Sequence, residues 1–87
     1  MPTEYIETFE FKLNADSSKQ ALLEGFEKSN QWFEQNPAFI YRSLAYNEEN
    51  NSWQDVLYWR SADAAQQAGE AFLNEPLNQL FAQQIDV

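Results

Sequence analysis

The chain has 87 residues, which is the size of one small domain and leaves no room for a second. It carries 14 Asp and Glu against 5 Lys and Arg, and a formal charge of -9 disfavours binding to nucleic acid or to an anionic membrane surface. Cysteine and histidine are absent, which excludes disulfides, thiolate and imidazole metal ligands, cysteine nucleophiles and a histidine ligand to haem iron. We therefore expect no metal and no cofactor.

Location and assembly follow from the same composition. Residues 1–4 carry an acid rather than a basic leader, and no apolar run approaches the length of a membrane span. We expect no targeting segment and a cytoplasmic location.

A domain of this size hides only about 60% of its unfolded surface, and the 3 Trp, 4 Tyr and 7 Phe are hard to bury in a monomer. This is a first indication of a homodimer.

Residues 3–13 alternate between two sets of side chains, which predicts a strand with one buried face. The second set is mostly polar. The first set is apolar except for Glu7, and its other members are Tyr5, Phe9, Phe11 and Leu13.

The period changes to that of a helix over residues 17–35, with Asp16 or Ser17 as the expected N-cap. Gly25 lies in the middle of this helix, where glycine destabilises by about 1 kcal/mol relative to alanine, so we expect it to permit close approach of another element. One stripe of the helix carries the buried positions, namely Leu22, Phe26, Ser29 and Phe33.

Two further strands are predicted at residues 38–47 and 53–60, joined by a two-residue turn at Asn50 and Asn51. Both alternating sets of residues 38–47 are largely apolar: Ile40, Leu44 and Tyr46 form one, and Phe39, Tyr41 and Ala45 the other. We therefore expect this hairpin to be covered on both faces. One layer of helices covers only one face, which is a second indication of a partner.

A second helix is predicted from Ser61 as N-cap, followed by a break near Pro76 and one or two helical turns over residues 76–85. The order is β-α-β-β-α, which is the ferredoxin-like plan with its last strand missing or truncated. The predicted fold is α+β, one domain over residues 1–87, with an antiparallel sheet and two helices on one face. We expect the segment 76–87 to cover the open sheet edge or to contact the partner.

Three stretches, residues 7–13, 32–44 and 53–65, resemble the antibiotic-biosynthesis-monooxygenase-like domains of the dimeric α+β barrel superfamily. Such domains have a proline-glycine-phenylalanine entry to their second strand, and here Pro37 and Phe39 flank Ala38. They also have an aspartate-apolar-apolar-x-tryptophan third strand, matched by residues 55–59, and a serine-x-x-x-alanine start to the next helix, matched by residues 61–65.

The resemblance implies a dimeric α+β barrel, in a family that contains cofactor-independent monooxygenases, haem-degrading enzymes and members without a known role. Its haem-degrading branch is expected to ligate iron through histidine, which this chain lacks. The family glycine is replaced by Ala38.

Candidate ligand-binding residues gather on one face of the predicted hairpin. A two-residue turn pairs Arg42 with Trp59, Leu44 with Leu57 and Tyr46 with Asp55. Two interpretations of this face stand side by side: an aromatic-walled pocket in which one cation and one carboxylate orient a polar ligand, or a core in which Arg42 stacks on Trp59 and pairs with Glu7 or Asp55. The candidate set is Arg42, Tyr46, Trp53, Asp55 and Trp59.

Three hypotheses of function remain. The first is a small dimeric protein that binds an apolar or aromatic molecule between sheet and helices. The second is a cofactor-independent monooxygenase acting on a phenolic or quinol-type substrate. The third is a structural or regulatory dimer without a ligand. The sequence leaves open whether the protein is an enzyme, and it supplies no catalytic residue.

Overall fold

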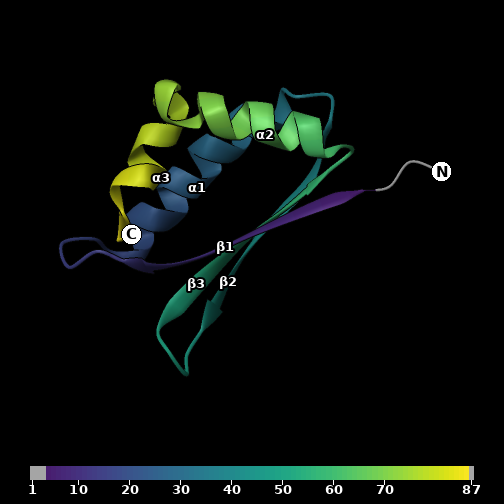
Figure 1. Cartoon of the computed structure of the whole chain (residues 1–87). Coiled ribbons are helices and arrows are strands. Elements are labelled where there is room, and N and C mark those ends of the chain that lie inside the picture. The colour runs from purple at the N-terminus through teal and green to yellow at the C-terminus, as the bar shows by residue number, and fades with distance from the viewer. Residues whose placement is uncertain (1–3, 87) are drawn as a thin grey trace.

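The computed structural model describes residues 4–86 (Figure 1). The predicted first strand begins at Thr3 and the predicted C-terminal segment ends at Val87, and both of these residues lie outside the described part. The elements in chain order are β1 (Tyr5–Leu13), α1 (Lys19–Glu34), β2 (Phe39–Asn47), β3 (Ser52–Trp59), α2 (Ala62–Ala71), the 3-10 turns η1 (Phe72–Asn74) and η2 (Pro76–Asn78), α3 (Gln79–Gln83) and β4 (Ile85–Asp86).

The sheet has the strand order β2-β3-β1-β4, and every neighbouring pair is antiparallel. The helices all lie on one side of the twisted sheet (Figure 1). The α+β, ferredoxin-like fold predicted from the order of the elements is therefore confirmed. No helix within the described residues is long and apolar enough to cross a membrane.

The last strand, expected to be missing or truncated, is present as the two-residue β4. Lys12 pairs with Asp86 and Leu13 with Ile85. The Asn14 amide N–H donates to the carbonyl of Gln84 at 3.0 Å, which extends the contact by one more residue. The segment after Pro76 thus covers one end of the β1 edge. This is the first of the two alternatives that the sequence left open for it, namely covering the sheet edge or contacting a partner.

Both long helices begin at serine caps. The hydroxyl of Ser61 accepts from the Ala64 amide, as predicted for α2. For α1 the cap is Ser18, which accepts from the Ala21 amide, rather than the predicted Asp16 or Ser17. Ser17 is engaged elsewhere, because its hydroxyl donates to Asn14 Oδ1 in the turn that precedes the helix.

The hairpin register differs from the prediction by two residues. Its loop is not the two-residue turn but the four residues 48–51, in which Asn51 adopts a positive φ of 54°. A shift of two leaves every side chain on the face where it was expected, because the side-chain period of a strand is two. The observed pairs on the helix-covered face are Arg42 with Leu57, Leu44 with Asp55 and Tyr46 with Trp53.

A β-bulge between Phe39 and Tyr41 corrects the expected partition of β2. The extra residue turns Phe39 away from the set of Tyr41 and toward the helices, where its ring lies 5.6 Å from those of Phe33 and Trp59. Within this chain the hairpin is not covered on both faces, because Tyr41 is 59% exposed.

The face of the sheet opposite the helices is open. Ile6 and Tyr41 both pair with Tyr58, so these three side chains form one row across β1, β3 and β2. Ile6 is 55% exposed, and the rings of Tyr41 and Tyr58 lie 5.9 Å apart. This open row is an apolar and aromatic surface that no other element of the described chain covers.

Candidate functional site

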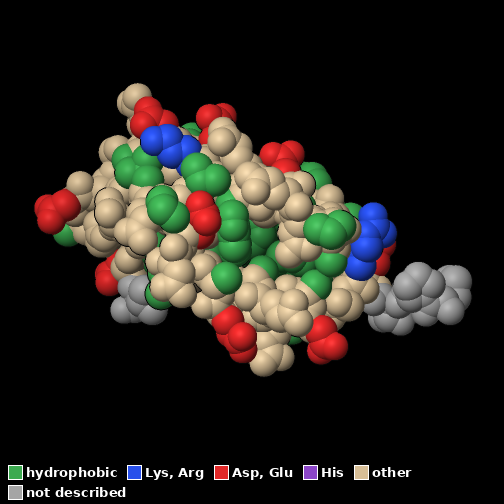
Figure 2. All heavy atoms as spheres, turned by 90° about the horizontal axis from the view of Figure 1, so that it is seen from above, with side chains coloured by type: hydrophobic (Ala, Val, Ile, Leu, Met, Phe, Trp, Pro, Cys, Tyr) green, Lys and Arg blue, Asp and Glu red, His purple; other side chains and the backbone are tan. Residues whose placement is uncertain are grey.

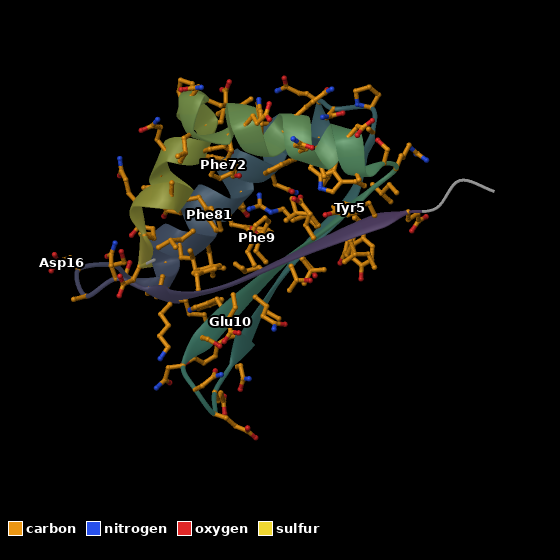
Figure 3. All side chains as sticks on the ribbon, in the orientation of Figure 1. Tyr5, Phe9, Glu10, Asp16, Phe72 and Phe81 are labelled. Carbon is orange, nitrogen blue, oxygen red and sulfur yellow. The ribbon has the colours of Figure 1, made fainter. Side chains whose placement is uncertain are left out.

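A cavity of about 430 Å³ lies between the sheet and the helices. Its volume is within the roughly 300–1,000 Å³ typical of small-molecule sites. Phe9 and Phe81 lie between β1 and the helices, whereas Glu10 lies on the other side of β1 (Figure 3). The walls come from the sheet, from the α2 region and from single residues of α1 and α3. They include Glu7, Phe9, Leu57, Trp59, Ala68 and Phe72.

Arg42 is the buried cation at the floor of this cavity, and each of its three guanidinium nitrogens donates to a protein atom. Nε donates to Asp55 Oδ1 at 2.9 Å and Nη2 donates to Asp55 Oδ2 at 2.6 Å, which is a bidentate pair. Nη1 donates to the hydroxyl of Ser29 on α1 at 2.9 Å. The side chains of Arg42 and Asp55 are only 1% and 6% exposed, so the two charges neutralise each other away from water.

Aromatic rings complete the surroundings of this guanidinium. Its Cζ atom lies 4.4 Å from the ring centre of Phe26, 4.7 Å from that of Phe33 and 4.9 Å from that of Phe81. Phe33 and Phe81 belong to the two separate hydrophobic clusters of the core. Arg42 therefore joins these clusters, with cation–π contacts on several sides.

Glu7 on β1 supplies a second carboxylate to the same cavity, in different surroundings. Its Oε1 accepts a hydrogen bond of 2.8 Å from the indole Nε1 of Trp59. Burial raises the pKa of Glu7 above its ordinary value, the Trp59 hydrogen bond opposes this rise, and the charge of Asp55 adds to it. Glu7 is therefore a half-buried carboxyl with a pKa above that of a free glutamate side chain.

Of the five predicted ligand-binding residues, the structure brings three to the cavity and leaves two outside its walls. Arg42, Asp55 and Trp59 line it. Tyr46 and Trp53 are paired near the hairpin loop, where the Tyr46 hydroxyl donates to Asn51 and Trp53 packs in the cluster of Phe11.

The observed contacts of Arg42 can be compared with the two interpretations of its role that the sequence allowed. Its acidic partner is Asp55, one of the two acids considered. The stacked rings are those of three phenylalanines rather than that of Trp59.

Glu7 was missed as a site residue, although the sequence contains its signal. It is the polar exception in the apolar set of residues 3–13, and a single acid on a buried strand face points to a partner or a cavity. Phe72 was also missed, because it follows α2 in a 3-10 turn whose side-chain direction the helical period does not give.

Acidic residues dominate the charges near the cavity. Figure 2 shows hydrophobic side chains in a hollow at the centre of the face seen from above, with acidic side chains around it. Residues 4–86 contain no cluster of three or more Asp or Glu side chains placed to hold a metal ion. The lining supplies apolar contact area, one neutralised ion pair and one carboxyl.

Solved structures share this fold, although no family model and no curated protein matches the chain. SnoaB, a cofactor-independent oxygenase from Streptomyces nogalater, aligns with a TM-score of 0.74 and 17% identity over 95% of this chain and 84% of its own; a point variant of SnoaB gives the same values. The protein YJCS aligns with a TM-score of 0.67 and 14% identity over 94% of this chain and 85% of its own. These likenesses confirm, for a single chain, the α+β, ferredoxin-like fold of the antibiotic-biosynthesis-monooxygenase-like domains that the sequence resembles.

Proposed function

We propose that the protein binds a small apolar or aromatic molecule in the cavity between the sheet and the helices. The observation that carries this proposal is the cavity itself, with a volume of about 430 Å³ and a largely apolar wall in a chain of 87 residues. A domain of this size with an interlocked core has few voids larger than a water molecule. The packing of Phe9, Leu57 and Phe72 around open space therefore favours a ligand over a purely structural role.

Gly69 provides a direct test of where the ligand binds. It lines the cavity, and a Cβ atom added there meets no atom within 4 Å. We expect Gly69→Leu to fill part of the cavity and to weaken binding of naphthol about tenfold or more, measured by calorimetric titration. Gln67→Leu, an exposed change on the same helix and outside the cavity walls, is the control and should bind as the wild type does. Equal binding by both variants would contradict the proposal.

A second candidate function is cofactor-independent oxygenation of a phenolic or quinol-type substrate. The observation that favours it is the shared fold of SnoaB, a cofactor-independent oxygenase. Oxidation of an anthrone CH₂ to C=O consumes one O₂ and releases one H₂O, so no external reductant is required. The protein then has to bind the substrate, exclude water and accept a proton. Oxygen uptake by wild-type protein with an anthrone tests this candidate, and an unchanged rate over buffer refutes it.

We further propose a homodimer in which the open sheet faces of two copies meet. Its support is the exposed row of Ile6, Tyr41 and Tyr58, together with a fold in which such faces are available for pairing. Ile6→Lys should convert the dimer to a monomer in sedimentation experiments. Leu23→Lys alters a similarly exposed apolar side chain on α1 and should leave the assembly unchanged. A monomeric wild type at micromolar concentration would disprove the dimer.

A further inference from the structure

We propose that Glu7 is the polar anchor of the cavity and selects aromatic ligands that offer a hydroxyl donor and carry no negative charge. The inference rests on the proposed ligand-binding function and specifies which chemistry the ligand must have.

The first step is that the Arg42 guanidinium is already engaged by protein groups, because three of its five N–H donors bind Asp55 and Ser29 and its side chain is only 1% exposed. Nε, Nη1 and Nη2 each donate to Asp55 or Ser29, and the guanidinium lies against three phenylalanine rings. A ligand carboxylate that took over the bidentate face of Arg42 would displace Asp55 and leave a buried carboxylate without its partner. The cation that the sequence offers for anion binding is therefore occupied by the protein itself.

The second step is that Glu7 has an acceptor to spare. Oε1 is taken by the Trp59 indole. For Oε2 the structure shows no protein donor anywhere in the described segment, residues 4–86. An indole N–H can only donate, so Trp59 fixes the carboxyl in one orientation without competing as an acceptor. A ligand hydroxyl that reaches Oε2 completes the hydrogen bonding of this group.

The third step concerns charge. Among the described residues that line the cavity, Arg42 is the single base, and Glu7, Asp55 and Asp86 are acids; Glu10 is a fourth lining residue, but its side chain lies on the other side of β1. Because Arg42 is neutralised by Asp55, the remaining field is negative. It opposes an anionic ligand and also contributes, through Asp55, to the raised pKa of Glu7. A hydrogen-bond donor is favoured whether Glu7 is ionised or neutral, because a protonated carboxyl keeps an acceptor oxygen.

Three probes with one ring system separate these contributions: naphthol, its methyl ether and naphthoate. They differ in carrying a donor, no donor or a negative charge. Calorimetric titration of the wild type should give naphthol the tightest binding, about tenfold or more above its ether, as expected for one hydrogen bond to a charged acceptor. Naphthoate should bind most weakly.

Variants of Glu7 then assign the preference. Glu7→Leu should abolish the difference between naphthol and its ether and improve binding of naphthoate, and Glu7→Gln should reduce the difference because an amide oxygen is a weaker acceptor. Glu27→Gln removes the same charge from the exposed side of α1 and should behave as the wild type does. Circular dichroism of both Glu7 variants checks that they fold, and Glu7→Gln keeps the test valid if the leucine variant does not.

The outcomes separate the two proposals. If none of the three probes binds the wild type, the ligand-binding function fails and the anchor fails with it. If the probes bind but naphthol has no advantage, or if its advantage survives in both Glu7 variants, the anchor is refuted while ligand binding stands. A wild type that prefers naphthoate would also refute it.

Discussion

Two carboxyl groups on neighbouring strands line the cavity floor in different surroundings: that of Asp55 is paired with a cation, and that of Glu7 is not. Asp55 on β3 is buried, and both of its carboxylate oxygens accept hydrogen bonds from the Arg42 guanidinium. Glu7 on the adjacent strand β1 receives one indole N–H and faces the cavity. The difference is one of position: β3 lies between β1 and β2, so Asp55 reaches the cation on β2 whereas Leu57 stands between Glu7 and that cation. Because β3 is the strand next to β2, its Asp55 is used in a structural ion pair with Arg42, whereas Glu7 on β1 keeps an oxygen free to bind another group.

The largest loss of stability is expected when the ion pair between Asp55 and Arg42 is broken. Asp55→Asn leaves the Arg42 guanidinium buried without a counter-charge, and loss of one partner of a buried pair typically destabilises by about 3–5 kcal/mol. Urea unfolding measures this loss. The double variant Arg42→Met with Asp55→Leu should recover most of it, because it removes both charges and retains the volume. A loss below about 1 kcal/mol, the range of a surface pair, would show that Asp55 is not the structural acid.

A smaller loss of stability is expected from a substitution that disturbs the packing around Arg42 without altering any charge. A Cβ atom on Gly25 would lie 2.6 Å from the backbone nitrogen of Phe81, whose ring packs on Arg42. Overpacking of this kind outweighs the helix propensity gained, so Gly25→Ala should destabilise by about 1–2 kcal/mol. Gly69→Ala is the matched control, because its Cβ meets nothing within 4 Å, and it should stabilise by up to about 1 kcal/mol. Equal shifts in both variants would contradict the close approach of α1 and α3.

The smallest effect is expected on the Glu7 side, as a change in pH dependence. Its folded pKa is raised by burial, so between the unfolded and folded pKa values the folded state binds more protons than the unfolded state. Stability is therefore lost as pH rises through this interval, starting from the ordinary value of about 4.3. Glu7→Gln should remove this loss, which urea unfolding at a series of pH values would show as the difference from the wild type. Glu27→Gln should retain the wild-type profile, and an identical profile for Glu7→Gln would contradict the raised pKa.

The sequence predicted the elements and the two faces of the sheet because both depend on local periodicity. The helical stripe of Leu22 and Phe33 is buried as predicted. In β1 the predicted buried face is only partly buried, because Phe11 is in the core whereas Tyr5 and Phe9 are 41% and 53% exposed. The length of the hairpin loop could not be predicted from Asn50 and Asn51, because these residues suit loops of two or of four residues. The resulting error of two residues in strand register does not change which face a side chain lies on, so the alternation of apolar residues could not reveal it. Strand β4 was missed because two residues carry no periodicity.

The candidate site was predicted less well for a related reason. Three of its five members line the cavity, but which acid neutralises Arg42 depends on register and on the placement of β1 beside β3. Neither is encoded in the local pattern. The bulge at Phe39 and Tyr41 was equally hidden, because both residues are aromatic and either face accepts them. The availability of Glu7 is a property of the assembled sheet.

The placement of β1 between β3 and β4 bears on the order in which the chain folds. β2 and β3 are joined by the short loop 48–51, whereas β1 meets β3 only after the intervening helix and β2, and meets β4 across almost the whole chain. Closing long loops lowers chain entropy more and slows pairing. We expect the hairpin to form first and β1 to pair with it late. An early folding intermediate would then hold Arg42 beside Asp55, whereas the cavity, whose wall includes Glu7, would form only when β1 and β4 pair.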